Sequence, residues 1–128
     1  MFSHIMLGAN DIEKSRGFYD AILGVLGHNP GVFDDKGRCF YLSDRGVFAL
    51  TKPINGEVAT HGNGMTIGFV ASSPELVDAW HAAGVAAGGQ TCEEPPGVRS
   101  SGGRKLYLAY LRDPSGNKIC ATHYMSVV

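Results

Sequence analysis

Hydrophobic and polar residues alternate along short segments of the chain, and this pattern occurs twice in similar surroundings. Residues 2–8 and residues 65–71 each place apolar side chains at alternate positions, which is the period of a β-strand. Each of these segments leads into a longer one, residues 11–26 and residues 74–87, that we expect to be helical. The pattern therefore predicts a strand followed by a helix in each half of the chain.

The two halves can be superimposed on one another without a gap. A single constant offset places Ile5 on Ile67, Leu7 on Phe69 and Phe18 on Trp80. Matching residue types at matching positions over a strand and a helix predict that the chain contains an internal repeat.

The later parts of the two halves also correspond. YLSD at residues 41–44 resembles YLRD at residues 110–113, and a turn containing glycine and a further strand follow each. The alignment of these last strands places Ala49 opposite Cys120. We therefore predict a single α+β domain over residues 1–128. It consists of two tandem βαβββ modules, about 1–55 and 62–126, that form a cupped, mainly antiparallel eight-stranded sheet with helices on its outer face.

The expected helix starts carry recognisable signals. Asn10 and Ser72 are residue types that cap helix N-termini, and glutamates follow three residues later at Glu13 and Glu75. This is the capping-box spacing, in which side chains satisfy the free backbone N–H groups of the first turn. Pro74 suits the first helical position, where a missing N–H costs nothing.

Alternation also sorts the strand residues between two faces of the sheet. Ile5 and Leu7 are expected beneath the first helix, which leaves His4 on the opposite face, toward the cup. Four positions correspond between the two halves on the cup side: His4, Ala49, Thr66 and Cys120. The cup lining is expected to include also Thr51, Gly68 and Thr122.

Composition and charge exclude several function classes. The 11 basic and 12 acidic residues give a net charge of −1, which does not favour binding to nucleic acid or to an anionic membrane. No stretch approaches the ~20 apolar residues of a transmembrane helix, and the N-terminal residues do not read as a secretory signal. Three scattered cysteines without CxxC spacing favour reduced thiols, and we expect a cytoplasmic protein.

Three motifs together resemble a known family. They are HIMLGANDIEKSRGFYDAILG at the start, NGMTIGF in the middle and YLAYLRDPSGNKI near the end, and they span nearly the whole chain. The chain thereby resembles the glyoxalase/bleomycin-resistance/dioxygenase group, the vicinal oxygen chelate superfamily. The resemblance implies paired βαβββ modules, a homodimer and a small-molecule site in each cup, often with a divalent metal.

The resemblance also implies four metal-ligand positions, and this chain departs from the pattern at three of them. His4 matches the ligand of the first strand, but Ala49 stands where the family often has Glu. Thr66 replaces the usual His, and Cys120 replaces the usual Glu. Because metal catalysis of this type needs about three protein ligands, we expect no metal and no other cofactor. A divalent metal would require an atypical site.

Several residues can be interpreted in two ways. His4 could donate a hydrogen bond to a ligand or act as a general base, or it could be an ordinary partly buried histidine. Cys120 could be a nucleophile beside His4 if its pKa were lowered, or an inert small residue. His61 and His123 could complete an unusual metal site, although His123 is expected on the strand face opposite to Cys120.

The segment 97–105, which is rich in Gly and Ser and also basic, lengthens the second module. It could be a lid in which Arg99, Arg104 and Lys105 bind a carboxylate or phosphate, or it could be a solvated mobile loop. Tyr107 and Tyr110, together with Tyr124, could line the cup with aromatic surface, or could reflect ordinary strand packing.

The sequence thus favours a protein that binds a small organic molecule in its cup without the family's metal. The alternative is an enzyme, either a lyase similar to lactoylglutathione lyase or a relative of the dioxygenases. Such an enzyme would use an atypical metal site or acid–base chemistry of His4 and Cys120. We expect a homodimer and no nucleic-acid or membrane partner. Nothing in the sequence identifies the ligand.

Overall fold

A computed structural model describes residues 1–125 of the chain, and the predicted end of the second module at residue 126 lies outside them. The first half contains the elements β1 (His4–Gly8), α1 (Ile12–Val25), β2 (Val32–Phe33), β3 (Cys39–Ser43) and β4 (Gly46–Thr51). The second half contains the elements β5 (Ile67–Val70), α2 (Pro74–Ala86), β6 (Gln90–Thr91), β7 (Gly97–Ser101), β8 (Arg104–Arg112) and β9 (Lys118–Tyr124). The fold is therefore α+β with tandem βαβββ halves, as predicted, and β7 is an additional strand.

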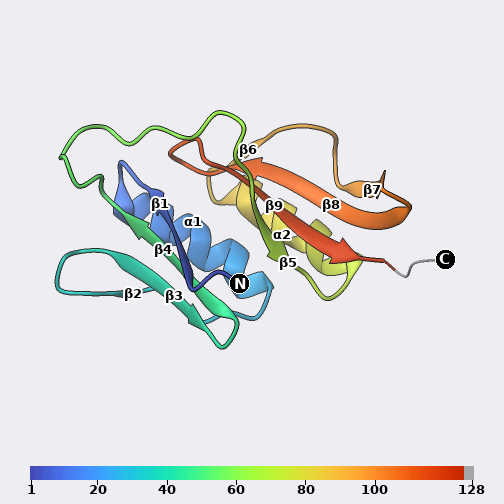
Figure 1. Cartoon of the computed structure of the whole chain (residues 1–128), viewed down its shortest axis with the longest axis horizontal. Coiled ribbons are helices and arrows are strands. Elements are labelled where there is room, and N and C mark those ends of the chain that lie inside the picture. Colours follow the sequence, from blue (N-terminus) through green and yellow to red (C-terminus); the bar gives the residue numbers. More distant parts are fainter. Residues whose placement is uncertain (126–128) are drawn as a thin grey trace.

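The strands form two open sheets, one from each half of the chain (Figure 1). Sheet A has the order β1-β4-β3-β2, and sheet B has the order β5-β9-β8-β6, with β7 paired to β8. In each sheet the first strand runs parallel to the last one, and the other pairs are antiparallel. No described strand of sheet A is paired with a strand of sheet B, so the two sheets meet only through side chains.

The internal repeat extends to the register of the strands. Met6 pairs with Ala49 in sheet A, and Gly68, which corresponds to Met6 in the alignment of the two halves, pairs with Cys120 in sheet B. The predicted correspondence between Ala49 and Cys120 is thereby confirmed.

The predicted match of YLSD with YLRD is wrong by one residue. Ala49 pairs with Phe40 whereas Cys120 pairs with Tyr110, so Phe40 and not Tyr41 corresponds to Tyr110. The reason is the turn that follows. Two residues separate the last pair of the β3–β4 hairpin, Ser43 and Gly46, whereas the longer DPSGN turn joins β8 to β9.

The N-cap of each helix is the residue after the predicted one. The side chain of Asp11 accepts a hydrogen bond from the backbone N–H of Lys14, and Ser73 does the same for Leu76. The predicted capping boxes are therefore absent, because three residues beyond these caps there is no glutamate. Asn10 instead joins the link between the halves, where it exchanges two hydrogen bonds with the backbone of Ala59. Pro74 occupies the first turn as predicted.

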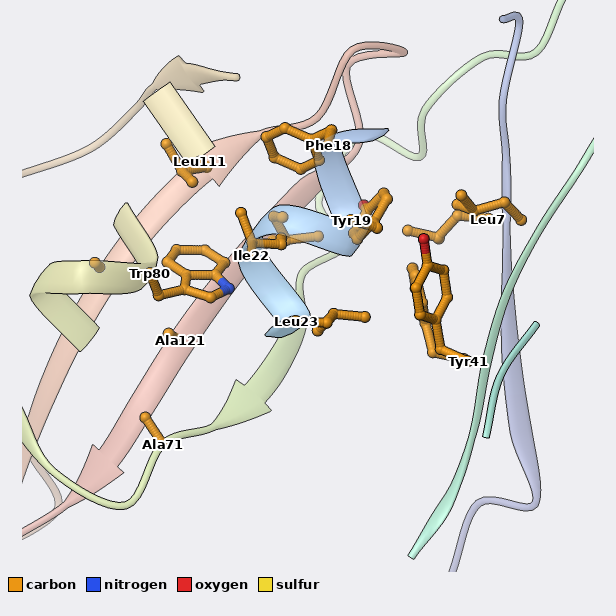
Figure 2. Packing of buried hydrophobic residues seen from close by; sticks show 14 of the residues in the cluster. Leu7, Phe18, Tyr19, Ile22, Leu23, Tyr41, Ala71, Trp80, Leu111 and Ala121 are labelled. Atoms are coloured by element: carbon orange, nitrogen blue, oxygen red, sulfur yellow. The ribbon is translucent and has the colours of Figure 1, made fainter. Parts of the chain in front are cut away.

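One hydrophobic core joins the two halves. Helix α1 buries residues at the spacing of one helical face, and Phe18, Ile22 and Leu23 are among them. Figure 2 shows these side chains with sheet A, represented by Leu7 and Tyr41, on one side and with Trp80 and residues of sheet B on the other. Both sheets therefore turn one face toward a shared core that contains both helices.

The two helices approach each other closely at Gly84 of α2. A Cβ atom at residue 84 would overlap the side chain of Leu111 and would lie 3.2 Å from Cγ2 of Ile22. Gly17 in α1 differs, because a Cβ atom there would have no neighbour within 4 Å. The absence of a side chain at Gly84 thus allows α2 to pack closely on both Leu111 of β8 and Ile22 of α1.

The DPSGN turn connects the core to β1. The Asp113 carboxylate is buried and accepts hydrogen bonds from the Tyr19 hydroxyl (2.7 Å) and from the Asn117 side chain (2.9 Å). The Asn117 amide also donates to the backbone carbonyl of Gly8 at 3.0 Å. This turn therefore holds together α1, the end of β1 and the β8–β9 hairpin, which come from both halves.

We predict opposite effects for two Gly→Ala substitutions in helices. Gly84→Ala should lower the free energy of unfolding by about 1–3 kcal/mol, because the added methyl overfills a packed core. Gly17→Ala should raise the free energy of unfolding by about 0.4–1 kcal/mol, because alanine lowers the entropy of the unfolded chain and meets open space. Urea unfolding of both variants measures the difference, and equal effects at the two positions would contradict the packing described here.

Candidate functional site

The predicted site residues of sheet A share its open face, which points away from the core. His4 and Ala49 lie diagonally across the β1–β4 ladder, since His4 pairs with Val47 and Met6 pairs with Ala49. The side chain of His4 is exposed, and its Nδ1 lies 2.8 Å from the Ser3 hydroxyl. Ala49 is buried but contributes only a methyl group to this face. Sheet A therefore offers one imidazole and no second metal ligand here.

The open face of sheet B holds the corresponding pair. Thr66 directly precedes β5 and is exposed, and Gly68 pairs with Cys120 on β9. Because Gly68 has no side chain, the Cys120 sulfur can lie over it; a Cβ atom at residue 68 would be 3.2 Å from Sγ. Thr122 follows on the same face, with its hydroxyl 3.6 Å from the Cys120 sulfur.

A single chain leaves these four positions as two separate pairs. His4 and Ala49 belong to sheet A, whereas Thr66 and Cys120 belong to sheet B, and the shared core lies against the other faces of the two sheets. The rings of Phe48 and Phe69 illustrate this arrangement: they come from opposite sheets and meet inside the core with centroids 5.2 Å apart. Each sheet therefore contributes one pair of the four positions.

The donors at these positions do not fit the metal of the family's metalloenzymes. Burial raises the pKa of the Cys120 thiol, which keeps it protonated and makes it a poor metal ligand near neutral pH. Alanine offers no ligand atom, and threonine offers a weak one. Within residues 1–125, no three or more His, Cys, Asp or Glu side chains are grouped so that they could hold a metal ion.

The unusual site built from His61 and His123 is not assembled in the chain. His123 points away from the open face, as predicted, and its Nδ1 lies 3.0 Å from the backbone carbonyl of Ala71. His61 lies against Gly116 in the turn between β8 and β9. The two imidazoles therefore have neighbours other than Cys120.

The tyrosines of β8 do not all face the predicted cup. Tyr110 pairs with Cys120 and shares its open face, whereas Tyr107 lies three residues earlier and on the opposite face. The Tyr107 hydroxyl donates to the Asp78 carboxylate of α2 at 2.8 Å. The prediction that Tyr107 lines the cup is wrong because an odd separation along a strand reverses the side-chain direction.

Residues 97–105 form strand β7, the two-glycine turn Gly102–Gly103 and the start of β8, so the segment is a β-hairpin and not an irregular loop. Both glycines have positive φ angles, 57° and 76°, which this tight turn requires. Arg99 donates to the backbone carbonyls of Glu94 and Pro95, and the Arg104 guanidinium lies 5.1 Å from the Tyr124 ring centroid. Both arginines thus have local partners, and Lys105 lies in β8.

An ion pair on the open face of sheet B was missed by the sequence reasoning. Lys118 pairs with Glu93, and its ammonium group lies 5.0 Å from the Tyr110 ring centroid. The hydrogen bond from Lys118 to Glu93 raises the pKa of Lys118, and burial raises the pKa of Tyr110. The signal was present in the sequence: Lys118 is two residues from Cys120, so alternation places both on one face.

A groove of about 290 Å³ opens at the seam between the two sheets. Two residues of the predicted site, His4 and Gly68, line it, whereas Ala49, Thr66 and Cys120 do not. Its other lining residues come from both faces of the two sheets, from the residues before β1, from the β3–β4 turn and from the end of α1. The sequence offered no signal for this groove, because its walls come from distant segments and from both sheet faces.

We predict that Cys120 reacts slowly with thiol reagents. Its raised pKa and its burial mean that alkylation by iodoacetamide at pH 7.5 should modify the partly exposed Cys92 first, leaving Cys120 and the buried Cys39 unmodified until the protein unfolds. Because the thiolate is the reactive form, the rate at Cys120 should increase only as the pH rises beyond the ordinary thiol pKa. Peptide mass spectrometry locates the label, and rapid labelling of native Cys120 would contradict this assignment.

Comparison with known proteins agrees with this fold. Residues 1–121 match the family model of the Glyoxalase/Bleomycin resistance protein/Dioxygenase superfamily. A crystal structure of a glyoxalase/bleomycin resistance protein from Albidiferax ferrireducens T118 is 64% identical, with a TM-score of 0.93 over 96% of this chain and 98% of that one.

Two more distant structures share the fold alone. A glyoxalase/bleomycin resistance protein/dioxygenase family enzyme from Burkholderia phytofirmans PsJN is 18% identical, with a TM-score of 0.74 over 96% of this chain and 98% of that one. A lactoylglutathione lyase from Agrobacterium tumefaciens is 20% identical, with a TM-score of 0.66 over 96% of this chain and 92% of that one. No curated protein matches significantly. The family match and the Albidiferax structure together show that this chain belongs to the glyoxalase/bleomycin resistance protein/dioxygenase superfamily.

Proposed function

We propose that the protein binds a small organic molecule between two open sheet faces, without the family's metal, and that a second copy of the chain completes each site. One observation carries the proposal: three of the four positions where family metalloenzymes hold their metal are Ala49, Thr66 and the protonated Cys120. What these positions present is small and mostly apolar, which suits contact with an organic ligand.

The open faces support the pairing of two copies. Leu42 on sheet A is 59% exposed and Val70 on sheet B is 56% exposed, although both lie in strands. A partner that covered the two open faces would bury both of these side chains. If sheet A of one copy faced sheet B of another, His4 and Ala49 would lie opposite Thr66 and Cys120, and each homodimer would contain two equal sites.

The relatives are compatible with binding and with catalysis, because they include a glyoxalase/bleomycin resistance protein and a lactoylglutathione lyase. The enzymatic alternative that uses His4 and Cys120 is not favoured, because burial raises the pKa of the Cys120 thiol and so disfavours the nucleophilic thiolate. Three free cysteines agree with a reducing compartment such as the cytoplasm. Among the helices of residues 1–125, none is long and apolar enough to cross a membrane.

Metal content tests the proposal directly. Protein purified without chelator should contain far less than one transition-metal ion per chain by mass spectrometry of the elements. The triple variant Ala49→Glu, Thr66→His, Cys120→Glu restores the family's ligand types beside His4, and it should take up about one zinc or manganese ion per chain. About one tightly bound metal ion in the unmodified protein would refute the proposal.

A matched control separates ligand chemistry from side-chain size. The variant Ala49→Gln, Thr66→Asn, Cys120→Gln places side chains of similar size at the same positions without the ligating carboxylates and imidazole. It should remain free of metal. If this control also acquired metal, the four positions would not be the site.

The pairing of two copies has its own prediction. Light scattering during gel filtration should give twice the chain mass of 13.6 kDa. Leu42→Glu should shift the protein toward monomer, because it buries a charge in the proposed contact. Val85→Glu should not, because Val85 is a similarly exposed apolar residue on α2, away from the open faces. A monomeric protein, or equal behaviour of the two variants, would contradict completion by a second copy.

A further inference from the structure

The seam groove has an apolar floor made of residues from both halves. Leu23 of α1, Phe48 of β4 and Phe69 of β5 line it, and the two phenylalanine rings meet edge to face. The groove exists because β1 pairs only with β4 and β5 only with β9, so that two unpaired strand edges border it. Its volume of about 290 Å³ is near the lower end of small-molecule pockets.

The rim of this groove carries mainly hydrogen-bond donors. Arg45 lies in the β3–β4 turn, where its backbone N–H donates to the Ser43 hydroxyl. Its guanidinium group is exposed and has no ion-pair or hydrogen-bond partner within residues 1–125. An unpaired guanidinium above an apolar floor suits an anionic oxygen group, which it can bind through two parallel hydrogen bonds.

Two imidazoles lie at the same rim. His28 is placed there by the end of α1, where Gly27 adopts a φ of 94° and the His28 N–H bonds to the Leu23 carbonyl at 2.9 Å. His4 is the second, and with its Nδ1 beside the Ser3 hydroxyl its Nε2 is left for other contacts. Asp44 carries the one carboxylate among the lining residues, and its negative charge would repel an anion.

We propose that the seam groove binds a small amphipathic anion. Its aromatic or branched apolar body lies against Phe48 and Phe69, and its carboxylate or sulfonate group lies at Arg45, within reach of the His28 imidazole. The site shares His4 and Gly68 with the predicted site on the open faces but contains none of Ala49, Thr66 and Cys120. It thus goes beyond the function proposed above, and either proposal can fail without the other.

Two fluorescent probes of similar shape test the charge requirement. The probe 1-anilinonaphthalene-8-sulfonate is an amphipathic anion, and N-phenyl-1-naphthylamine is its neutral counterpart. Arg45→Gln should raise the Kd of the anionic probe about fivefold or more and change that of the neutral probe less than about twofold, because only the charge-assisted hydrogen bonds are lost. Lys36→Gln removes one positive charge from an exposed loop outside the groove and should change neither Kd.

Two further variants sharpen the charge test. Arg45→Lys keeps the charge and should retain much of the affinity for the anionic probe, whereas Asp44→Asn should increase it. The proposal is overturned if Arg45→Gln and Lys36→Gln change the Kd of the anionic probe equally. It is also overturned if Arg45→Gln raises the Kd of both probes by the same factor. Lack of binding of the anionic probe to the unmodified protein would also overturn it.

A second pair of variants tests the location. His28→Trp places a larger side chain at the rim of the groove. It should raise the Kd of both probes about fivefold or more, because it occupies apolar volume that both probes use. Asn29→Trp changes the next residue of the same exposed loop, which is outside the groove lining. It should change the Kd of neither probe. Circular dichroism and melting temperature confirm folding of each variant. Equal effects of the two tryptophans would place the probes elsewhere, for example on the open sheet faces, and would overturn the proposal.

Discussion

The buried carboxylate of Asp113 is the interaction on which the joining of the two halves depends. A charge in the core is costly unless hydrogen bonds compensate it, and here one donor comes from a distant part of the chain, whereas the others lie in the same turn. Tyr19 of α1 and Asn117 of the turn both donate to it, and Asn117 also reaches the carbonyl that ends β1. The carboxylate thus specifies one relative placement of α1, β1 and the β8–β9 hairpin, which hydrophobic contact alone would leave adjustable.

Much of the fold was predictable because it follows from local periodicity. The alternation around Ile5 and Ile67, the helix signal at Pro74 and the constant offset between the two halves each depend on a few neighbouring residues. The errors arose where two residues competed for one role. Asn10 and Asp11 are both good caps, and the sequence does not reveal that the amide of Asn10 is engaged by the backbone of Ala59. The predicted match of Tyr41 with Tyr110 was wrong because the two hairpins have turns of different length. An alignment based on the strands before the turns therefore differs by one residue from an alignment based on the strands after them.

The site was less predictable than the fold. Alternation correctly placed Ala49 and Cys120 on the open faces, but it carries no information on how the two sheets are oriented. That orientation is determined by the packing of α1 on α2 and by the core between the sheets, where Phe48 meets Phe69. The seam groove escaped prediction for the same reason. Arg45 and His28 stand in no recognisable motif, and they acquire a shared surface only when the two halves come together.

The glycine at the helix crossing has a consequence beyond core packing. Gly84 allows the backbone of α2 to lie against the side chains of Ile22 in α1 and Leu111 in β8, and each helix carries its own sheet with it. The width of the gap between the edges of β1 and β5 is therefore governed by a residue that does not line it. A protein with this design could alter the size of molecule accepted at the seam by changing the helix spacing, while every side chain that touches the molecule stayed the same.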